Sequence, residues 1–147
     1  MARVIAVVSG KGGVGKSTLC AALAVKLCKT GYKVLAIDMD FGLRNLDVML
    51  GLENNCIYDM QDVFQKNCSA HKAVVKHNVY KNLGFIAAAG VVDRQTISIS
   101  RMKEIIDDLK DAYDYIILDC PAGLHNGFVL SACVCDTALI VTTPDTY

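Results

Sequence analysis

The sequence predicts a three-layer α/β/α domain with a mainly parallel sheet. Three observations support this fold class. Short aliphatic runs alternate with segments of helical periodicity along the chain. A glycine-rich loop joins the first aliphatic run to the first helical segment. The 147 residues, 53% of them hydrophobic, suffice for one well-buried domain and are too few for two ordinary ones.

The first elements form a strand–helix–strand unit. The β-branched run at residues 3–8 predicts a strand that is buried on both faces. Residues 17–30 predict a helix, which Gly31 ends, and residues 33–37 predict a second strand that stops at Asp38. The apolar face of this helix is expected at Leu19, Ala22, Leu23 and Leu27. Because a helix joins them, the two strands should be parallel with a right-handed crossover.

The later elements continue the alternation. They are a loop with a short helix at 41–55, a short helix at 58–65, a strand at 83–88, a helix at 99–109, a strand at 115–118, a helix at 128–135 and a strand at 137–142. The 99–109 helix should begin at Ser98 or Ser100 and bury an apolar face that includes Ile99. In such folds ligands bind at the carboxyl ends of the strands, where Ser9, Asp38 and Asp119 fall.

Composition limits the classes of partner and compartment. The formal net charge is zero, so no overall field attracts nucleic acid or an anionic membrane. No uncharged apolar stretch is long enough to span a bilayer, and the N-terminus lacks the features of a secretion signal. We therefore expect a cytoplasmic protein. The seven cysteines contain no CxxC pair, which favours free thiols that act as small buried hydrophobes.

Residues 10–17, GKGGVGKS, fit the phosphate-loop pattern GxxxxGK[ST] and lie between a buried strand and a helix, as that motif requires. Glycines let the backbone wrap a phosphate, and the helix adds the positive end of its dipole. The motif predicts a P-loop NTPase-like domain that binds ATP or ADP with Mg²⁺. Its nucleotide-binding residues are Gly10, Lys11, Gly12, Gly13, Val14, Gly15, Lys16, Ser17 and Thr18. Lys16 should reach the β- and γ-phosphates, Ser17 should ligate Mg²⁺, and Thr18 could donate to the α-phosphate.

Acidic residues complete the predicted site. Asp119 ends an aliphatic strand, as a Walker B acid does, and should hold Mg²⁺ through water. Asp38 and Asp40 end the second strand. An acid at this place could bind a ribose, or it could position the attacking water or the metal. We favour the second role, because the loop is of the Walker type and lacks GxGxxG.

Residues 11–18, KGGVGKST, resemble the signature of the MinD/ParA family of deviant Walker A ATPases. Residues 38–47, DMDFGLRNLD, and 119–123, DCPAG, resemble the switch I and switch II segments of its MinD branch. The resemblance implies that Lys11 reaches the partner's phosphates across an ATP-dependent homodimer. It also implies catalytic roles for Lys11, Lys16 and Asp40, of which Asp40 orients the hydrolytic water. By the same resemblance Ser17, Asp38 and Asp119 hold or support the metal.

The resemblance further implies a biological role. A MinD-like protein hydrolyses ATP to ADP and phosphate and acts as a dimerising switch in bacterial division-site placement. Its implied partners are MinC-like and MinE-like regulators, with no nucleic acid. Family members continue well beyond the position of Tyr147 and dock on the membrane through a C-terminal helix. The chain is therefore expected to be the N-terminal part, residues 1–147, of one ATPase domain truncated at its C-terminal side, and its parent a peripheral membrane protein.

The chain departs from the family pattern in two places. Residues 124–127, LHNG, put His125 where MinD proteins commonly carry glutamate, and a surface or packing role is favoured over that of a catalytic base. Truncation would leave residues 137–142 as an unpaired apolar edge strand, which predicts self-association or strand exchange.

Three alternatives remain open. A ParA-type DNA partition ATPase would need a basic surface, for which Lys72, Lys76 and Lys81 are candidates, although a solvated face explains them more simply. An iron–sulfur electron donor could use Cys120 and Cys133, but their spacing is unconvincing. The third alternative is a fragment that binds nucleotide without turning it over.

Overall fold

The computed structural model of the chain describes residues 1–93 and 95–144, and Tyr147 lies outside them. The strands in the described part are β1 (Arg3–Val8), β2 (Val34–Asp38), β3 (Val75–Lys76), β4 (Leu83–Ile86), β5 (Tyr115–Asp119) and β6 (Thr137–Ile140). The helices are α1 (Lys16–Lys29), α2 (Leu46–Leu50), α3 (Met60–Phe64), α4 (Ala70–Ala73), α5 (Ile99–Leu109) and α6 (Asn126–Val134). Every strand and helix predicted above is present, with ends that differ by a few residues.

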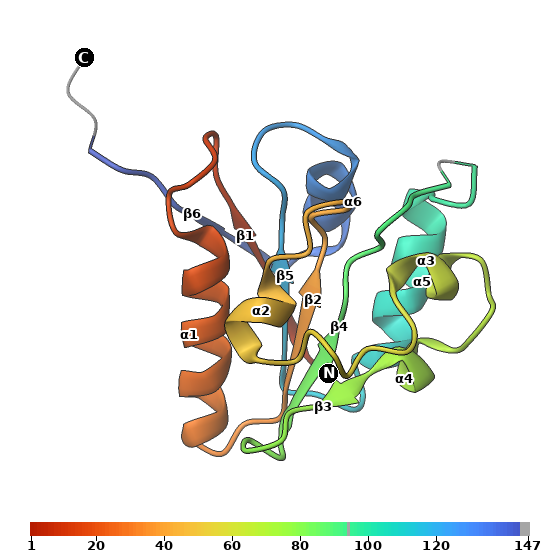
Figure 1. Ribbon diagram of the computed structural model, residues 1–147, viewed down its shortest axis with the longest axis horizontal. Helices are drawn as coiled ribbons and strands as arrows, with labels where there is room; N and C mark the ends of the chain where they lie inside the picture. Colours follow the sequence, from red (N-terminus) through yellow and green to blue (C-terminus); the bar gives the residue numbers. More distant parts are fainter. Residues whose placement is uncertain (94, 145–147) are drawn as a thin grey trace.

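The sheet has the strand order β3-β4-β2-β5-β1-β6 (Figure 1). All neighbouring strands are parallel except β3, which runs antiparallel to β4. The prediction of a mainly parallel sheet is therefore confirmed. Because β5 lies between β1 and β2, the carboxyl ends of these three strands meet at one edge, and Asp38 of β2 is the register partner of Asp119 of β5.

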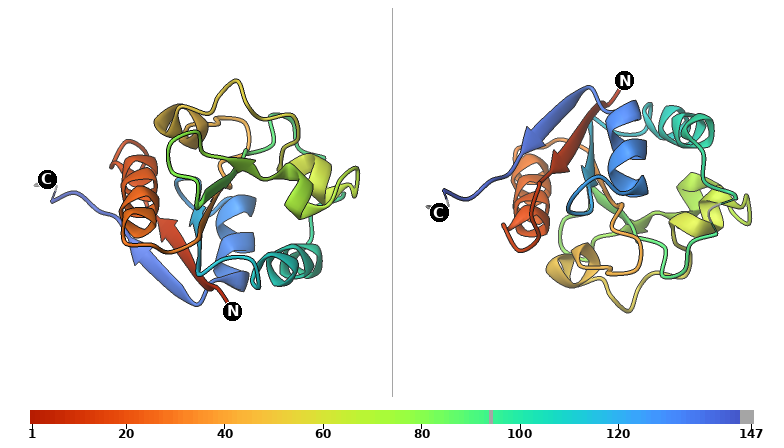
Figure 2. Two further views of the ribbon diagram at one scale, coloured as in Figure 1. Left: turned by 90° about the horizontal axis from the view of Figure 1, so that it is seen from below. Right: turned by 90° about the horizontal axis from the view of Figure 1, so that it is seen from above.

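Helices cover both faces of the sheet and make three layers (Figures 1 and 2). Along β2, Val34 and Ala36 pack in the core beneath α1 and α2, whereas Leu35 and Ile37 pack in the core shared with α3, α4, α5 and α6. This alternation follows from the two-residue period of a strand. The run at residues 3–8, for which burial on both faces was predicted, is buried in β1 except for the exposed Arg3 and the half-buried Ile5.

The buried face of α1 differs from the prediction. It consists of Lys16, Cys20, Ala24 and Cys28. Leu19 is 40% exposed, Ala22 is exposed, and Leu23 and Leu27 are only partly buried at the edge of the core. Small side chains on the buried stripe let the helix lie close to the sheet, and the leucines fill the margins of that contact. The prediction of a leucine face was therefore wrong, because the buried face lies one residue further along the sequence.

The helix α5 matches its prediction except at its first residue. The Ser98 hydroxyl accepts a hydrogen bond from the Arg101 N–H at 3.1 Å, so Ser98 is the N-cap. Ile99 is 41% exposed, contrary to the prediction, whereas Met102 in the same turn is fully buried. Two short elements were not predicted, α4 and β3, and the Ser69 hydroxyl caps α4 by accepting from the Lys72 N–H.

Among the described residues, the strand β6 forms one edge of the sheet and pairs with β1 alone. Its exposed side chains include Leu139 at 36% and Ile140 at 77%. The predicted apolar edge strand is thus present, and the self-association expected from it stays a prediction.

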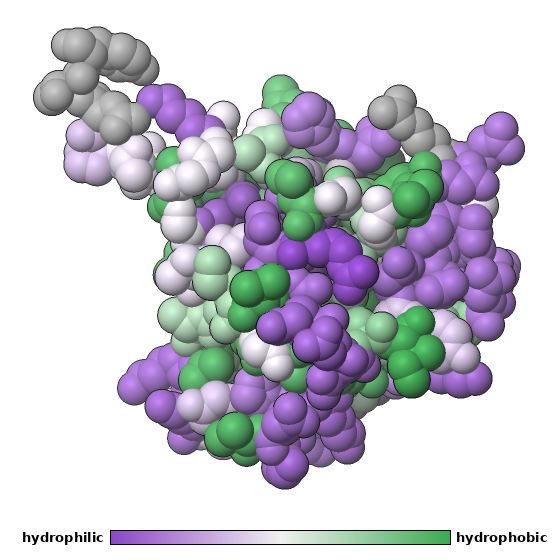
Figure 3. Space-filling model, in the orientation of Figure 1, coloured by the Kyte–Doolittle hydropathy of each residue, from purple (hydrophilic) through white to green (hydrophobic). Residues whose placement is uncertain are grey.

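The cysteines are mostly buried, and the exposed apolar residues are dispersed. Four of the seven cysteines are buried and Cys133 is exposed, and none forms a disulfide within the described residues. On the face shown in Figure 3, hydrophobic side chains form separate spots in a mainly hydrophilic surface. No helix in the described part of the chain is long and apolar enough to cross a membrane.

Candidate functional site

The glycine-rich loop connects the end of β1 to the start of α1. Gly13 and Gly15 adopt positive φ angles of 72° and 90°, which side chains other than glycine's rarely allow. Gly15 is the N-cap of α1, yet no side chain caps this helix end, and its first turn holds no acidic residue. The first N–H groups of α1 therefore have no side-chain acceptor, and the positive end of the helix dipole faces the loop. Such an end is suited to bind a phosphate.

Lys16 and Ser9 connect this loop to β5 and to the segment that follows β5. Lys16 is buried at 9% exposure, and its Nζ lies 3.9 Å from Asp119 Oδ1. The Ser9 hydroxyl donates to the Lys11 carbonyl at 2.8 Å, and the Ser9 carbonyl accepts from the Gly123 N–H at 3.1 Å. The loop is thus tied to the segment that follows β5, which resembles switch II. Ser17 is half-buried, while Lys11 and Thr18 are exposed.

Asp119 is the most unusual polar group in the site. It is fully buried, and neither carboxyl oxygen accepts a hydrogen bond from the described residues. Burial raises the pKa of this carboxyl, while the neighbouring Ser17 hydroxyl and Lys16 ammonium act to lower it. Buried acceptor atoms without a partner carry a large desolvation cost. A hard cation such as Mg²⁺, bound directly or through water, would satisfy them.

Asp38 lies beside Asp119 but, unlike Asp119, accepts hydrogen bonds. Its two carboxyl oxygens accept hydrogen bonds from the backbone N–H of Asp40 at 2.9 Å and of Leu46 at 3.2 Å. Burial raises the pKa of Asp38 to about 7, and the charge of Asp119 adds to this rise, against the two backbone hydrogen bonds. Asp38 therefore anchors both ends of the loop between β2 and α2. Its predicted support of the metal stays a prediction.

A cavity of about 1040 Å³ opens beside this group of residues. The phosphate loop, the loop after β2, residues 121–122 and residues 124–127 line it. Asp40 is half-buried on its wall, where burial raises the pKa of the carboxyl and the charges of Lys16 and His125 lower it. The structure thus brings together the phosphate loop, Asp38, Asp40 and Asp119, as the sequence predicted.

The sequence analysis missed the roles of two residues after β5. Gly127 is the second residue of α6, and a Cβ atom there would lie 2.2 Å from the Met39 carbonyl oxygen, so only glycine fits. A glycine at the start of a helix, where its propensity is poor, was the available signal. His125 is exposed, which agrees with the surface role that was favoured for it, and it also lines the cavity.

Within the described residues, no group of three or more His, Cys, Asp and Glu side chains could hold a metal ion. A metal at Asp119 would therefore need further oxygen ligands from Ser17, from water and from a bound phosphate. The two thiols considered for an iron–sulfur cluster differ in their surroundings. Cys120 is buried, which raises its thiol pKa to about 12, and Cys133 is exposed on α6.

A phosphate loop at the end of a parallel strand, a buried lysine and a buried aspartate whose oxygens accept no hydrogen bond from the described residues define the nucleotide-binding class of P-loop α/β domains. The chain belongs to the AAA domain family, whose sequence pattern matches residues 2–147.

Within this class the chain is similar to MinD proteins. It is 46% identical over 145 residues to the septum site-determining protein MinD of Helicobacter pylori, a match that covers 99% of this chain and 54% of that protein. A solved MinC:MinD cell division protein complex of Aquifex aeolicus is 43% identical, with a TM-score of 0.83 over 95% of this chain and 55% of that one. MinD of Pyrococcus horikoshii, solved with Mg-ADP, is 34% identical, with a TM-score of 0.85 over 99% of this chain and 59% of that one. The chain spans about half the length of the curated relatives it matches.

Proposed function

We propose that this chain binds ATP or ADP with Mg²⁺ and is part of a MinD-like ATPase, a dimerising switch in division-site placement. One observation carries the proposal. The uncapped start of α1 and the buried Lys16 lie beside Asp119, whose buried oxygens accept no hydrogen bond from the described residues. A phosphate would bind the start of α1 and Lys16, and Mg²⁺ would satisfy the oxygens of Asp119.

Each residue has a role in this proposal. Lys16 binds the β- and γ-phosphates, and Ser17 and Asp119 hold Mg²⁺, the latter through water. Asp38 supports them from the next strand and anchors the loop that carries Asp40. Mg²⁺, when bound, neutralises charge on the phosphates. Asp40, on the cavity wall, orients the water that attacks the terminal phosphate.

The dimeric switch is proposed on the same grounds. Lys11 is exposed on the loop, from which it would reach the phosphates of a second subunit in an ATP-dependent homodimer. The similarity to a MinD solved in complex with MinC supports a MinC-like partner, and a MinE-like regulator is proposed with it. We further propose that the full-length parent is cytoplasmic and reaches the membrane through a C-terminal helix.

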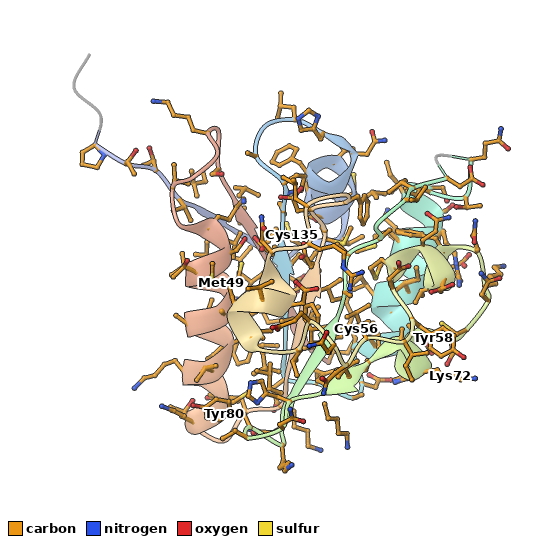
Figure 4. All side chains as sticks on the ribbon, in the orientation of Figure 1. Met49, Cys56, Tyr58, Lys72, Tyr80 and Cys135 are labelled. Atoms are coloured by element: carbon orange, nitrogen blue, oxygen red, sulfur yellow. The ribbon has the colours of Figure 1, made fainter. Side chains whose placement is uncertain are left out.

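The DNA partition alternative has less support. It depends on Lys72, Lys76 and Lys81, and the formal net charge of the chain is zero. The Lys72 ammonium lies over the Tyr58 ring at 5.3 Å, so it already has an intramolecular partner (Figure 4). The alternative of a nucleotide-binding chain without turnover is tested by the hydrolysis measurement described below. Salt-dependent retention on DNA would revive the first alternative.

Calorimetric titration with ATP·Mg²⁺ and ADP·Mg²⁺ tests the binding step. Lys16→Ala should weaken binding by about tenfold to a hundredfold, because a buried charge-assisted contact to phosphate is lost. Lys26→Ala, at the other end of α1, is the matched control and should bind like the parent. Lys11→Ala should bind nucleotide but fail to dimerise or hydrolyse it.

Three results separate the alternatives. Equal binding by the parent and Lys16→Ala would refute the site. A parent that binds ATP without hydrolysing it would favour the fragment. If the unsubstituted chain binds no nucleotide, the proposal that this chain is active is refuted, although its family membership stands.

A further inference from the structure

His77 is a half-buried histidine in the turn that joins β3 to β4. Both of its ring nitrogens have backbone partners. Nδ1 accepts the Val79 N–H at 3.0 Å and the Tyr80 N–H at 3.1 Å, and Nε2 donates to the Leu50 carbonyl at 3.1 Å. A carbonyl can only accept and an N–H can only donate, so these three contacts fix the ring as the neutral tautomer with its proton on Nε2.

The Leu50 carbonyl connects His77 to the wall of the nucleotide cavity. Leu50 is the last residue of α2, and the preceding Met49 lines the cavity (Figure 4). The other end of α2 is held by the Asp38 carboxyl, which accepts the Leu46 N–H at 3.2 Å. A helix of five residues is not stable by its own hydrogen bonds. Its position therefore depends on packing and on the contacts at its two ends, one of which His77 makes.

Protonation of His77 would disrupt this arrangement at Nδ1. In the charged imidazole both ring nitrogens carry a proton, so Nδ1 becomes a donor that faces the Val79 and Tyr80 N–H groups. The ring must then turn away from these two donors. Because the ring is rigid, Nε2 leaves the Leu50 carbonyl at the same time. Histidine is the side chain that ordinarily takes up a proton between about pH 5 and pH 8.

The charges around the ring do not compensate for this loss. The Tyr80 ring lies 5.0 Å from the imidazole, and Lys29 Nζ at the end of α1 lies 5.7 Å from the centre of the same Tyr80 ring. The ion pairs of the described residues include none with His77. The carbonyl end of α2 attracts a positive charge, but this one contact is outweighed by the two hydrogen bonds lost at Nδ1. The charged residues on the adjoining segments are mainly cations: Lys26, Lys29, Lys76 and Lys81, against Glu53 and Asp47, which pairs with Arg44.

We propose that His77 is a pH-sensitive switch for α2. The neutral ring fixes the C-terminal end of the helix to the turn between β3 and β4, and protonation releases it together with Met49 on the cavity wall. A released wall must be ordered again when nucleotide binds, so acid weakens nucleotide binding through His77. This consequence for binding rests on the proposed function, whereas the switch itself does not.

Magnetic resonance of the nucleotide-free chain tests the switch. At about pH 8 the His77 ring should carry its proton on Nε2, and as the pH falls to about 5.5 the methyl signal of Met49 should shift in step with the His77 ring. The exposed His71 on α4 is the reference ring. Met102, buried in the core on the opposite face of the sheet, is the reference methyl group. A proton on Nδ1 at about pH 8, or a Met49 signal that does not follow the ring, would overturn the proposal.

Two substitutions separate the effect of His77 from that of Asp38, which titrates in the same range and also contacts α2. The amide of His77→Gln can donate and accept but cannot gain a proton, so the pH-dependent shift of Met49 should disappear. In His77→Ala the Met49 signal should move, at about pH 8, in the direction in which acid moves it in the unsubstituted chain. A shift that persists unchanged in His77→Gln would originate from Asp38 and would refute the switch.

Calorimetry with ADP·Mg²⁺ tests the consequence for the cavity. Between about pH 8 and about pH 5.5 the unsubstituted chain should lose about twofold to tenfold more affinity than His77→Gln, the range that one hydrogen bond sets. Protonation of Asp38 and of the nucleotide is common to both chains and cancels in this ratio. Equal losses would overturn the effect on binding.

The switch and the proposed function can fail separately. If the unsubstituted chain binds no nucleotide, the proposed function fails, and the resonance measurement alone decides whether His77 controls α2. If the chain binds nucleotide and Met49 does not follow the His77 ring, the proposed function stands and the switch is refuted.

Discussion

Replacing Gly127 by alanine should break the contact between the start of α6 and the end of β2. The added Cβ atom would lie 2.2 Å from the Met39 carbonyl oxygen and 2.9 Å from Pro121 Cδ, well short of the 3.4 Å at which ordinary contact begins. The first of these neighbours is backbone in a hydrogen-bonded segment and cannot turn aside. The start of α6 must therefore move away from the sheet.

The expected loss of stability follows from overpacking. Extra methyl groups in a packed site cost about 1–3 kcal/mol, and the better helix propensity of alanine returns up to about 1 kcal/mol. We expect Gly127→Ala to lower the free energy of unfolding by about 1–2 kcal/mol. Gly84→Ala should cost less than this. The three nearest neighbours of its Cβ atom would be side-chain atoms, Val74 Cγ1 at 2.8 Å, Tyr113 Oη at 2.9 Å and Leu35 Cδ1 at 3.2 Å. A side chain can shift further than a hydrogen-bonded backbone, although the β-branched Val74 has little rotamer freedom.

Urea unfolding followed by circular dichroism measures these differences, and the chain has no tryptophan to follow by fluorescence. Gly90→Ala is the matched control. A Cβ atom at Gly90 would meet nothing within 4 Å, so its unfolding free energy should stay within about 0.5 kcal/mol of the parent. The reasoning would be refuted if Gly127→Ala were as stable as Gly90→Ala, because α6 would then not be held against Met39.

Two further predictions concern pH and association. Burial places the pKa of Asp38 at about 7 in the folded chain, above its ordinary value of 3.8, so the nucleotide-free fold binds this proton more tightly than the unfolded chain does. The free energy of unfolding should therefore fall as pH rises from about 4 to about 7, by at most about 1.4 kcal/mol per pH unit. Urea unfolding at several pH values in this range measures it, and a flat or rising profile would contradict the prediction. Because Ile140 on β6 is exposed, the unsubstituted chain should self-associate at high concentration, and Ile140→Lys should reduce the association. Light scattering measures both. A sharp monomer peak for the parent would speak against the edge as a contact site.

The sequence by itself determined the features that depend on neighbouring residues. The phosphate loop could be predicted because its glycines permit positive φ angles at Gly13 and Gly15, and because the loop lies between a strand and a helix. Aliphatic runs of strand length gave the layered α/β/α class. The acids Asp38 and Asp119 were placed at the site because parallel strands end at one edge of the sheet.

Only the tertiary structure decided the features that depend on which segments meet. The strand order puts β5 between β1 and β2, and this makes Asp38 and Asp119 neighbours. The fold also buries Asp119 where its oxygens accept no hydrogen bond from the described residues. The close approach of α1 to the sheet selected the stripe of small residues over the adjacent leucines. The contact of Gly127 with Met39 turns the segment with His125 toward the nucleotide cavity. These contacts join residues distant in sequence, so no local pattern of the chain encodes them.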